Sequence, residues 1–200
     1  KYRDWKKLIT ALAPNAVVFG KEGTRWCGNE AGATRDTEWN AIPYTEDPRT
    51  MNLFADITGE DVASIDKLMK GKYLHYQPAE TNTSIREGWF YRNDDEQQVR
   101  NTDDVFDIYE RSVGGNSIFL LNIPPNREGR FSEKDVKVLQ ETGKRIKETY
   151  GIDLLEKAEG PVELLDANED TFMVLDNDKL ILEFKIPKEA KINRFVIQED

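Results

Sequence analysis

The sequence predicts an α/β fold: the C-terminal portion of a (β/α)8-like barrel followed by a truncated all-β sandwich domain. Three observations predict it. Apolar strand-like runs alternate with amphipathic helices over residues 1–157, long loops follow two of these runs, and short, partly alternating runs fill residues 158–200. Only about four strands fit after residue 157, whereas a typical sandwich has about seven. We therefore expect a barrel part at 1–157 and an incomplete sandwich at 158–200.

The first half of the barrel part is predicted to consist of two helix–strand units. One helix covers residues 5–12 and precedes a short apolar strand at residues 16–20. A second helix is indicated by Thr58 and Asp61, which have the spacing of a capping box, and it precedes a strand at residues 73–77. The repeated order of helix and strand favours a parallel sheet.

The second half adds two further helices around one more strand. A helix over residues 102–113 ends at Gly114 and leads into the apolar run at residues 117–125. Because this run has no polar alternation, we expect both faces of its strand to be covered. The last helix begins at the capping box of Ser132 and Asp135 and ends near residue 150.

The loops favour a barrel over an open nucleotide-binding sheet. Residues 21–57 and 78–101 form connections far longer than the usual ~2–6 residues of such folds. Both follow the carboxyl ends of predicted strands, where barrel enzymes carry their active sites. The sequence contains no Gly-rich phosphate-binding loop.

The composition argues against nucleic acid as a partner and against disulfides, Cys/His metal sites and membrane spans. Lys and Arg number 28 against 38 Asp and Glu, and the net charge of -10 would repel a phosphate backbone. Cys27 and His75 are the only cysteine and histidine, so neither an internal disulfide nor a Cys/His metal site can form. No apolar run approaches the ~20 residues of a membrane span. We expect no nucleic acid, membrane span, metal or cofactor; the oligomeric state stays open.

The segment RWCGNEAGATRDTEW, residues 25–39, is the first candidate for chemistry. Glu30 follows a predicted strand end and would lie at the barrel mouth, where a carboxylic acid can serve as general acid. Trp26 and Trp39 would desolvate this group or stack on a sugar.

The same segment has a structural interpretation. Glu30 and Glu38 would pair with Arg25 and Arg35 and brace a long loop, because carboxylates also occur in structural ion-pair networks. The spacing alone does not decide between a brace and a catalytic acid.

The second long loop carries Glu80, Arg86 and Trp89 after the predicted strand at residues 73–77. A tryptophan beside a carboxylate suits saccharide binding. The alternative is that the aromatic residues 89–91 form core beneath the loop, although alternation would still leave one of them facing out. His75, in the middle of a strand, is interpreted as a hydrogen-bonded core histidine rather than a base.

Three segments in chain order resemble one enzyme family. RWCGNEAGATRDTEW, QPAETNTSIREGWFY and SVGGNSIFLLNIPPNREGRFSEKDVKVLQETGKRI are similar to the latter half of the catalytic domain of α-L-fucosidases of glycoside hydrolase family 29, in the α-1,3/1,4 branch. INRFVIQED resembles the start of the β-sandwich that follows the barrel in this family. The resemblance covers nearly the whole chain.

The resemblance implies retaining hydrolysis of terminal α-linked L-fucose from a fucosylated oligosaccharide or glycoconjugate. It implies that Glu30 is the acid/base and that Trp89 lines the fucose pocket, with Arg25, Trp26 and Glu38 as further substrate-binding residues. The family nucleophile is an aspartate on a strand upstream of GNE, and no residue here matches it. We therefore expect the 200 residues alone to be inactive. The family also suggests a periplasmic or secreted location.

Two other functions remain open at this point. One is a non-catalytic carbohydrate-binding or interaction protein that uses its tryptophans as platforms. The other is a retaining glycosidase for a different sugar, such as a galactosidase, because a carboxylate and a tryptophan at a barrel mouth do not select a sugar. The preference for fucose comes from the resemblance alone.

Overall fold

The computed structural model of the chain describes residues 2–20, 23–93, 95–168, 170–174 and 181–197. It divides into two compact units, Lys1–Thr142 and Gly143–Asp200, which are described separately. Across the described ranges, no helix is both long and apolar enough to cross a membrane.

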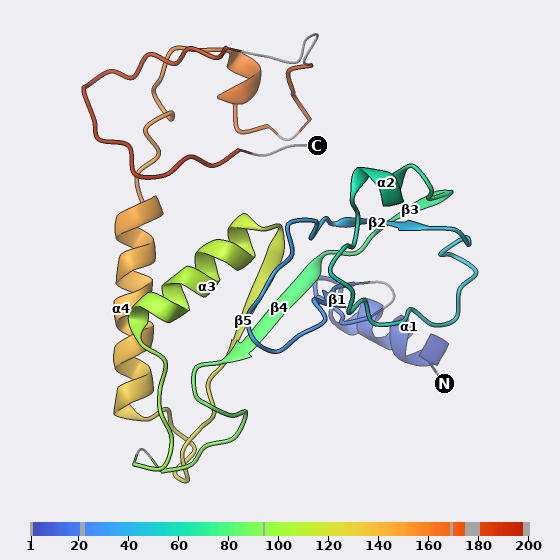
Figure 1. Ribbon diagram of the computed structural model, residues 1–200, viewed down its shortest axis with the longest axis vertical. Coiled ribbons are helices and arrows are strands. Elements are labelled where there is room, and N and C mark those ends of the chain that lie inside the picture. Colours follow the sequence, from blue (N-terminus) through green and yellow to red (C-terminus); the bar gives the residue numbers. More distant parts are fainter. Residues whose placement is uncertain (1, 21–22, 94, 169, 175–180, 198–200) are drawn as a thin grey trace. The chain divides into compact units, whose positions relative to one another are not determined.

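A parallel sheet of three strands forms the centre of the first unit (Figure 1). Its order is β1 (Arg25–Trp26), β4 (Ala79–Ser84) and β5 (Ser117–Asn122). Trp26 pairs in register with Glu80, and Glu80 pairs with Ile118 on the next strand. The predicted α/β class with a parallel sheet is therefore confirmed, while closure into a barrel stays a prediction.

The two faces of this sheet differ in burial. The helix α3 (Thr102–Gly114) contacts β5, and the side chains of Thr81 and Thr83 on β4 are buried. On the alternate positions of β5, Ile118 and Leu120 remain 44% and 43% exposed. The expectation that both faces of β5 are covered is wrong for the described residues, because elements pack against one face only.

The two long helices form where the sequence predicts them. Asn101 caps α3 by accepting a hydrogen bond from the Asp104 backbone N–H at 2.8 Å, and Val105, Phe106 and Ile108 form its buried face. The helix α4 (Glu133–Tyr150) follows Ser132, whose Oγ accepts from the Asp135 N–H at 3.4 Å. Periodicity and caps are local signals, which explains why these predictions hold.

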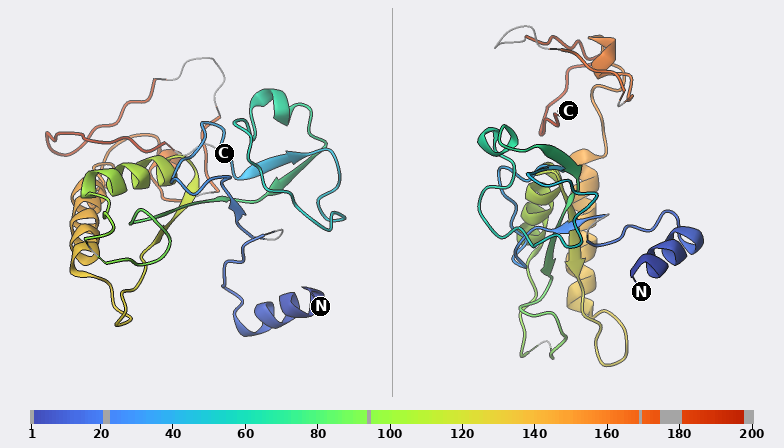
Figure 2. Two further views of the ribbon diagram at one scale, coloured as in Figure 1. Left: turned by 60° about the horizontal axis from the view of Figure 1, so that its bottom comes forward. Right: turned by 90° about the vertical axis from the view of Figure 1, so that its right-hand side faces the viewer.

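A two-stranded antiparallel ribbon lies in the connection between β1 and β4 (Figure 2). It pairs β2 (Ala41–Tyr44) with β3 (Tyr73–Tyr76), and the short helix α2 (Ile65–Leu68) lies between them in sequence. Ile42, Val62 and Ala63 form a small core there. The strand predicted at residues 73–77 thus exists, but it belongs to this ribbon. The parallel strand is β4, and all six of its residues lie in the segment 78–101, which the sequence predicts to be a loop.

The N-terminal helix α1 (Tyr2–Leu12) forms as predicted, but the strand expected at residues 16–20 does not. Only an isolated bridge joins Phe19 to Thr24, and the first parallel strand is instead β1. Val17 is 75% exposed. A strand requires a pairing partner as well as apolar residues, and in this sheet the partner β4 pairs with Arg25 and Trp26.

The sandwich predicted at residues 158–200 stays a prediction. The described residues of this segment contain a 3-10 helix, η1 (Val162–Leu164), and an antiparallel bridge between Glu159 and Lys185. Parts of the short runs expected within residues 158–200, including the end of INRFVIQED, fall on residues 175–180 and 198–200, which lie outside the described residues.

Candidate active site

The loop that carries Glu30 turns tightly at two glycines directly after β1. Gly28 and Gly32 have φ angles of +93° and +79°, which disfavour residues with a Cβ. The side chain of Asn29 closes the loop, because its Oδ1 accepts from the backbone N–H groups of Ala31 and Ala33 at 3.0 and 3.2 Å. Glu30 lies at the exposed tip of this turn.

Gly28→Ala tests how strongly this turn depends on glycine. A Cβ there would collide with the Ile57 carbonyl oxygen and the Arg35 guanidinium, and the positive φ would be strained. We expect the free energy of unfolding to fall by about 1–3 kcal/mol, measured by urea denaturation with tryptophan fluorescence. Gly59→Ala is the control, since no heavy atom lies within 4 Å of its added Cβ. Equal losses in both variants would contradict the proposed strain.

Glu38 lies in a buried brace with two arginines. Its Oε1 is 2.5 Å from Nη1 of Arg25, and its Oε2 is 2.9 Å from Nη1 of Arg35. Arg35 also donates to the carbonyl oxygens of Cys27 and Ile57 at 2.5 and 2.8 Å. With 3% of its surface exposed, Glu38 serves to hold the loop ends together, as the structural interpretation of this segment expected.

Glu30 has a different environment from Glu38. Its Oε2 accepts a hydrogen bond of 2.9 Å from Nε1 of Trp89, which lies 59 residues further along the chain. The carboxylate is exposed, and the indole ring of Trp89 is half-buried. A carboxylate that is open to solvent and oriented by one neutral donor remains free to exchange a proton with a ligand.

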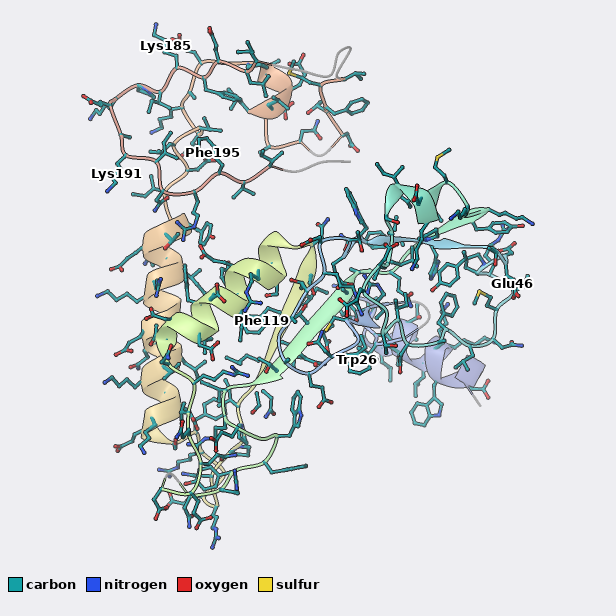
Figure 3. The ribbon with its side chains drawn as sticks, viewed as in Figure 1. Trp26, Glu46, Phe119, Lys185, Lys191 and Phe195 are labelled. Atoms are coloured by element: carbon teal, nitrogen blue, oxygen red, sulfur yellow. The ribbon has the colours of Figure 1, made fainter. Side chains whose placement is uncertain are left out.

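The other predicted site residues lie on β1 and in the brace of Glu38. Arg25 and Trp26 form β1, and Trp26, labelled in Figure 3, is half-buried in register with Glu80 of β4. The structure therefore brings Glu30 and Trp89 together as a contacting pair. It places Arg25 and Glu38 in the buried brace beneath the same loop.

The loop of Trp89 is tied to α4 by a buried ion pair. Nε and Nη2 of Arg86 donate to the two carboxylate oxygens of Asp135 at 2.9 and 3.0 Å, and Nη2 also contacts Ser132 Oγ at 2.5 Å. The guanidinium lies 4.8 Å from the ring centroid of Tyr91. The sequence presented Asp135 only as a helix-capping residue, since no local signal connects positions 49 residues apart.

The aromatic residues of this loop do not form a common core. Phe90 is 86% exposed, while Trp89 and Tyr91 are half-buried. Phe90 is therefore the one aromatic residue of the three that faces out, as the alternation in the core interpretation expected. Its carbonyl oxygen accepts instead from Nε2 of buried Gln97 at 3.2 Å, so polar contacts hold the loop where apolar packing does not.

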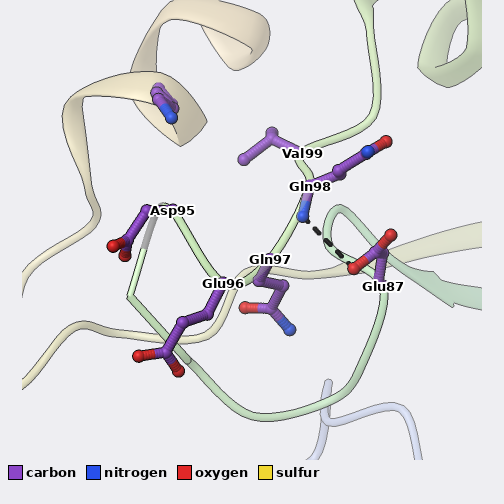
Figure 4. Close-up of a pocket in the computed structure, with 7 residues that line it drawn as sticks. Glu87, Asp95, Glu96, Gln97, Gln98 and Val99 are labelled. Carbon is purple, nitrogen blue, oxygen red and sulfur yellow. Dashed lines mark hydrogen bonds between the residues drawn. The ribbon is translucent and has the colours of Figure 1, made fainter.

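A shallow cavity of about 470 Å³ lies behind this loop (Figure 4). It is lined by Glu87, Asp95, Glu96, Gln97, Gln98, Val99 and Lys134. Neither Glu30 nor Trp89 lines it, and the backbone N–H of Gln98 donates to Glu87 Oε2 at 3.3 Å across it. Among the residues that the structure describes, no group of three or more His, Cys, Asp or Glu side chains could hold a metal ion.

Comparisons with known proteins identify the family of this chain. Residues 19–150 match the family model described as alpha-L-fucosidase. The chain is 36% identical over 156 residues to "Alpha-L-fucosidase 1" of Arabidopsis thaliana, which covers 77% of this chain and 29% of the plant protein. The chain thus spans less than a third of that relative.

Solved structures give the same result. A Bacteroides ovatus structure named "putative alpha-L-fucosidase" has 34% identity and a TM-score of 0.66, covering 80% of this chain and 29% of the other. A structure named SpGH29 has 28% identity and a TM-score of 0.67, covering 92% of this chain and 41% of the other. With a family model that matches well over half of its residues, the chain belongs to the alpha-L-fucosidase family.

Proposed function

We propose that this chain supplies the acid/base half of a retaining α-L-fucosidase that releases terminal α-linked L-fucose from fucosylated glycans. The observation that carries the proposal is the exposed carboxylate of Glu30, held by the indole N–H of Trp89 at 2.9 Å. Membership of the alpha-L-fucosidase family supports the substrate class.

In this proposal Glu30 transfers protons in both steps of the reaction. It first protonates the glycosidic oxygen as the leaving group departs, and a carboxylate nucleophile forms the fucosyl-enzyme. Glu30 then removes a proton from the water that hydrolyses this intermediate. Trp89 orients Glu30 and lines the sugar pocket together with Trp26, while Arg25 and Glu38 hold the loop.

The nucleophile is not assigned to any residue of this chain. The only aspartate before Glu30 is Asp4, which lies in α1 rather than at the end of a strand. By resemblance, the nucleophile lies on a barrel strand that precedes β1. We use "full-length enzyme" below for a polypeptide that contains both this chain and those upstream strands.

The full-length enzyme and the isolated chain are tested with a panel of 4-nitrophenyl glycosides. We expect the full-length enzyme to hydrolyse the α-L-fucoside in preference to galactosides, and the isolated chain to be inactive. NMR of the first product should show α-L-fucose, because a retaining mechanism inverts the anomeric centre twice. Preferred hydrolysis of another glycoside, or initial release of the β-anomer, would contradict the proposal. If the isolated chain hydrolyses the fucoside and Glu30→Gln abolishes this activity, the proposal that the nucleophile lies outside this chain is contradicted.

A further inference from the structure

The side chain of Asn122, at the end of β5, contacts the loop of Trp89 rather than open solvent. Its Nδ2 donates to the backbone carbonyl oxygen of Trp89 at 3.1 Å and to Ser84 Oγ at 3.0 Å. We propose that Asn122 is a positioning residue: it holds the Trp89 backbone so that the indole N–H reaches Glu30. This inference rests on the fucosidase function proposed above.

Three consecutive carbonyl groups of the Trp89 loop are held by side chains. Ser84 Oγ donates to the Gly88 oxygen at 2.8 Å, Asn122 Nδ2 donates to the Trp89 oxygen, and Gln97 Nε2 donates to the Phe90 oxygen at 3.2 Å. This segment belongs to no helix or strand. Side-chain donors therefore replace the regular hydrogen bonds that would otherwise fix its backbone.

The parallel sheet fixes two of these three donors, Ser84 and Asn122. Ser84 and Asn122 are paired in register at the ends of β4 and β5, and the Ile85 N–H donates to the Asn122 carbonyl at 2.9 Å. Ser84 is 5% exposed. The ends of two parallel strands thus set the position of the Trp89 backbone.

Backbone position matters for Glu30 because a tryptophan side chain has only two torsions. Once the Trp89 backbone is held and its ring is half-buried, the indole nitrogen has little freedom to follow a moving carboxylate. Small displacements of catalytic groups reduce rates steeply. Asn122 would therefore act on the reaction through Trp89 and Glu30, without touching the substrate.

Asn122→Asp removes the donor while it preserves shape. A carboxylate oxygen would then face the Trp89 carbonyl oxygen, and two acceptors cannot form that hydrogen bond. Asn126→Asp is the matched control, because Asn126 uses its Oδ1 to accept from the N–H groups of Glu128 and Arg130 at 2.9 and 3.0 Å. An aspartate can make the same contacts there with the same change in charge.

The first measurement uses this chain and needs no activity. In a ¹⁵N-labelled sample, Trp89→Phe identifies the Trp89 indole resonance among the four tryptophans. We expect Asn122→Asp to move this indole proton upfield and to speed its exchange with solvent, and we expect Asn126→Asp to leave it in place. An unchanged indole resonance in Asn122→Asp would overturn the positioning role.

The second measurement uses the full-length enzyme. Asn122→Asp should lower kcat/KM about 10- to 100-fold for a poor leaving group and less for 4-nitrophenol, since only the poor leaving group needs its proton early. In a Trp89→Phe background, which lacks the indole donor, the further loss should nearly vanish. Equal losses of kcat/KM for both substrates would overturn the inference. A loss from Asn122→Asp that is as large in the Trp89→Phe background as in the wild type would overturn it as well. Wild type without fucosidase activity would instead refute the proposed function, while the NMR result would still stand.

Discussion

Glu30→Ala in the full-length enzyme is expected to lower kcat/KM for a fucoside with a poor leaving group by about 10²–10⁴-fold, the usual contribution of general acid catalysis. The exposed carboxylate and its single Trp89 donor leave Glu30 available for proton transfer. For 4-nitrophenyl fucoside, kcat/KM should fall less, because this leaving group departs without protonation when the fucosyl-enzyme forms. The two substrates are compared by steady-state kinetics.

Azide and a matched glutamate provide the controls for this prediction. Azide should restore turnover of the activated fucoside in Glu30→Ala, because an anionic nucleophile needs no general base to attack the fucosyl-enzyme. Glu46→Ala removes an exposed glutamate on the loop after β2 and should leave both rates unchanged (Figure 3). Equal losses for both leaving groups in Glu30→Ala would remove Glu30 from the acid role.

Asp135→Ala is expected to lower the free energy of unfolding of the first unit by about 3–5 kcal/mol, because it leaves the Arg86 guanidinium buried without its counter-charge. The side chains of Arg86 and Asp135 are both 0% exposed, and Asp135 accepts from Nε and Nη2. Urea denaturation monitored by tryptophan fluorescence measures the loss, since all four tryptophans lie in this unit.

An exposed pair of the same residue types is the matched control for Asp135. Arg111 and Asp107 on α3 form an ion pair of 2.8 Å whose side chains are 50% and 63% exposed, so Asp107→Ala should cost at most about 1 kcal/mol. The double variant Arg86→Met, Asp135→Leu should be less destabilised than Asp135→Ala, because it removes the charge as well as its partner. If Asp135→Ala and Asp107→Ala lose equal amounts, the buried pair does not anchor the loop.

Local signals predicted α1, α3, α4 and the strand β5. The helix expected from the capping-box spacing of Thr58 and Asp61 is instead the four-residue α2, which begins at Ile65. The apolar face of α3, the Ser132 cap of α4 and the run of apolar residues in β5 depend on neighbours within a few positions. The strand β4 was missed because its buried positions include Thr81 and Thr83, so that its sequence shows no contrast between apolar and polar faces. Its pairing with β1 and β5 connects residues 54 and 38 positions apart, respectively, which no local pattern reports.

The sequence by itself determined the α/β class, the long helices, the family resemblance and the two loops that carry the candidate site. Spacing alone could not separate Glu30 from Glu38, because both lie near arginines in one segment, and only the family resemblance pointed to Glu30 as the acid/base. Only the tertiary structure decided the surroundings of the two carboxylates: it buries Glu38 against Arg25 and Arg35, and it places Trp89 of a distant loop against Glu30. Ion pairs and hydrogen bonds require groups that are close in space. The parallel pairing of β1 with β4 brings together the loops that follow these two strands, which carry Glu30 and Trp89.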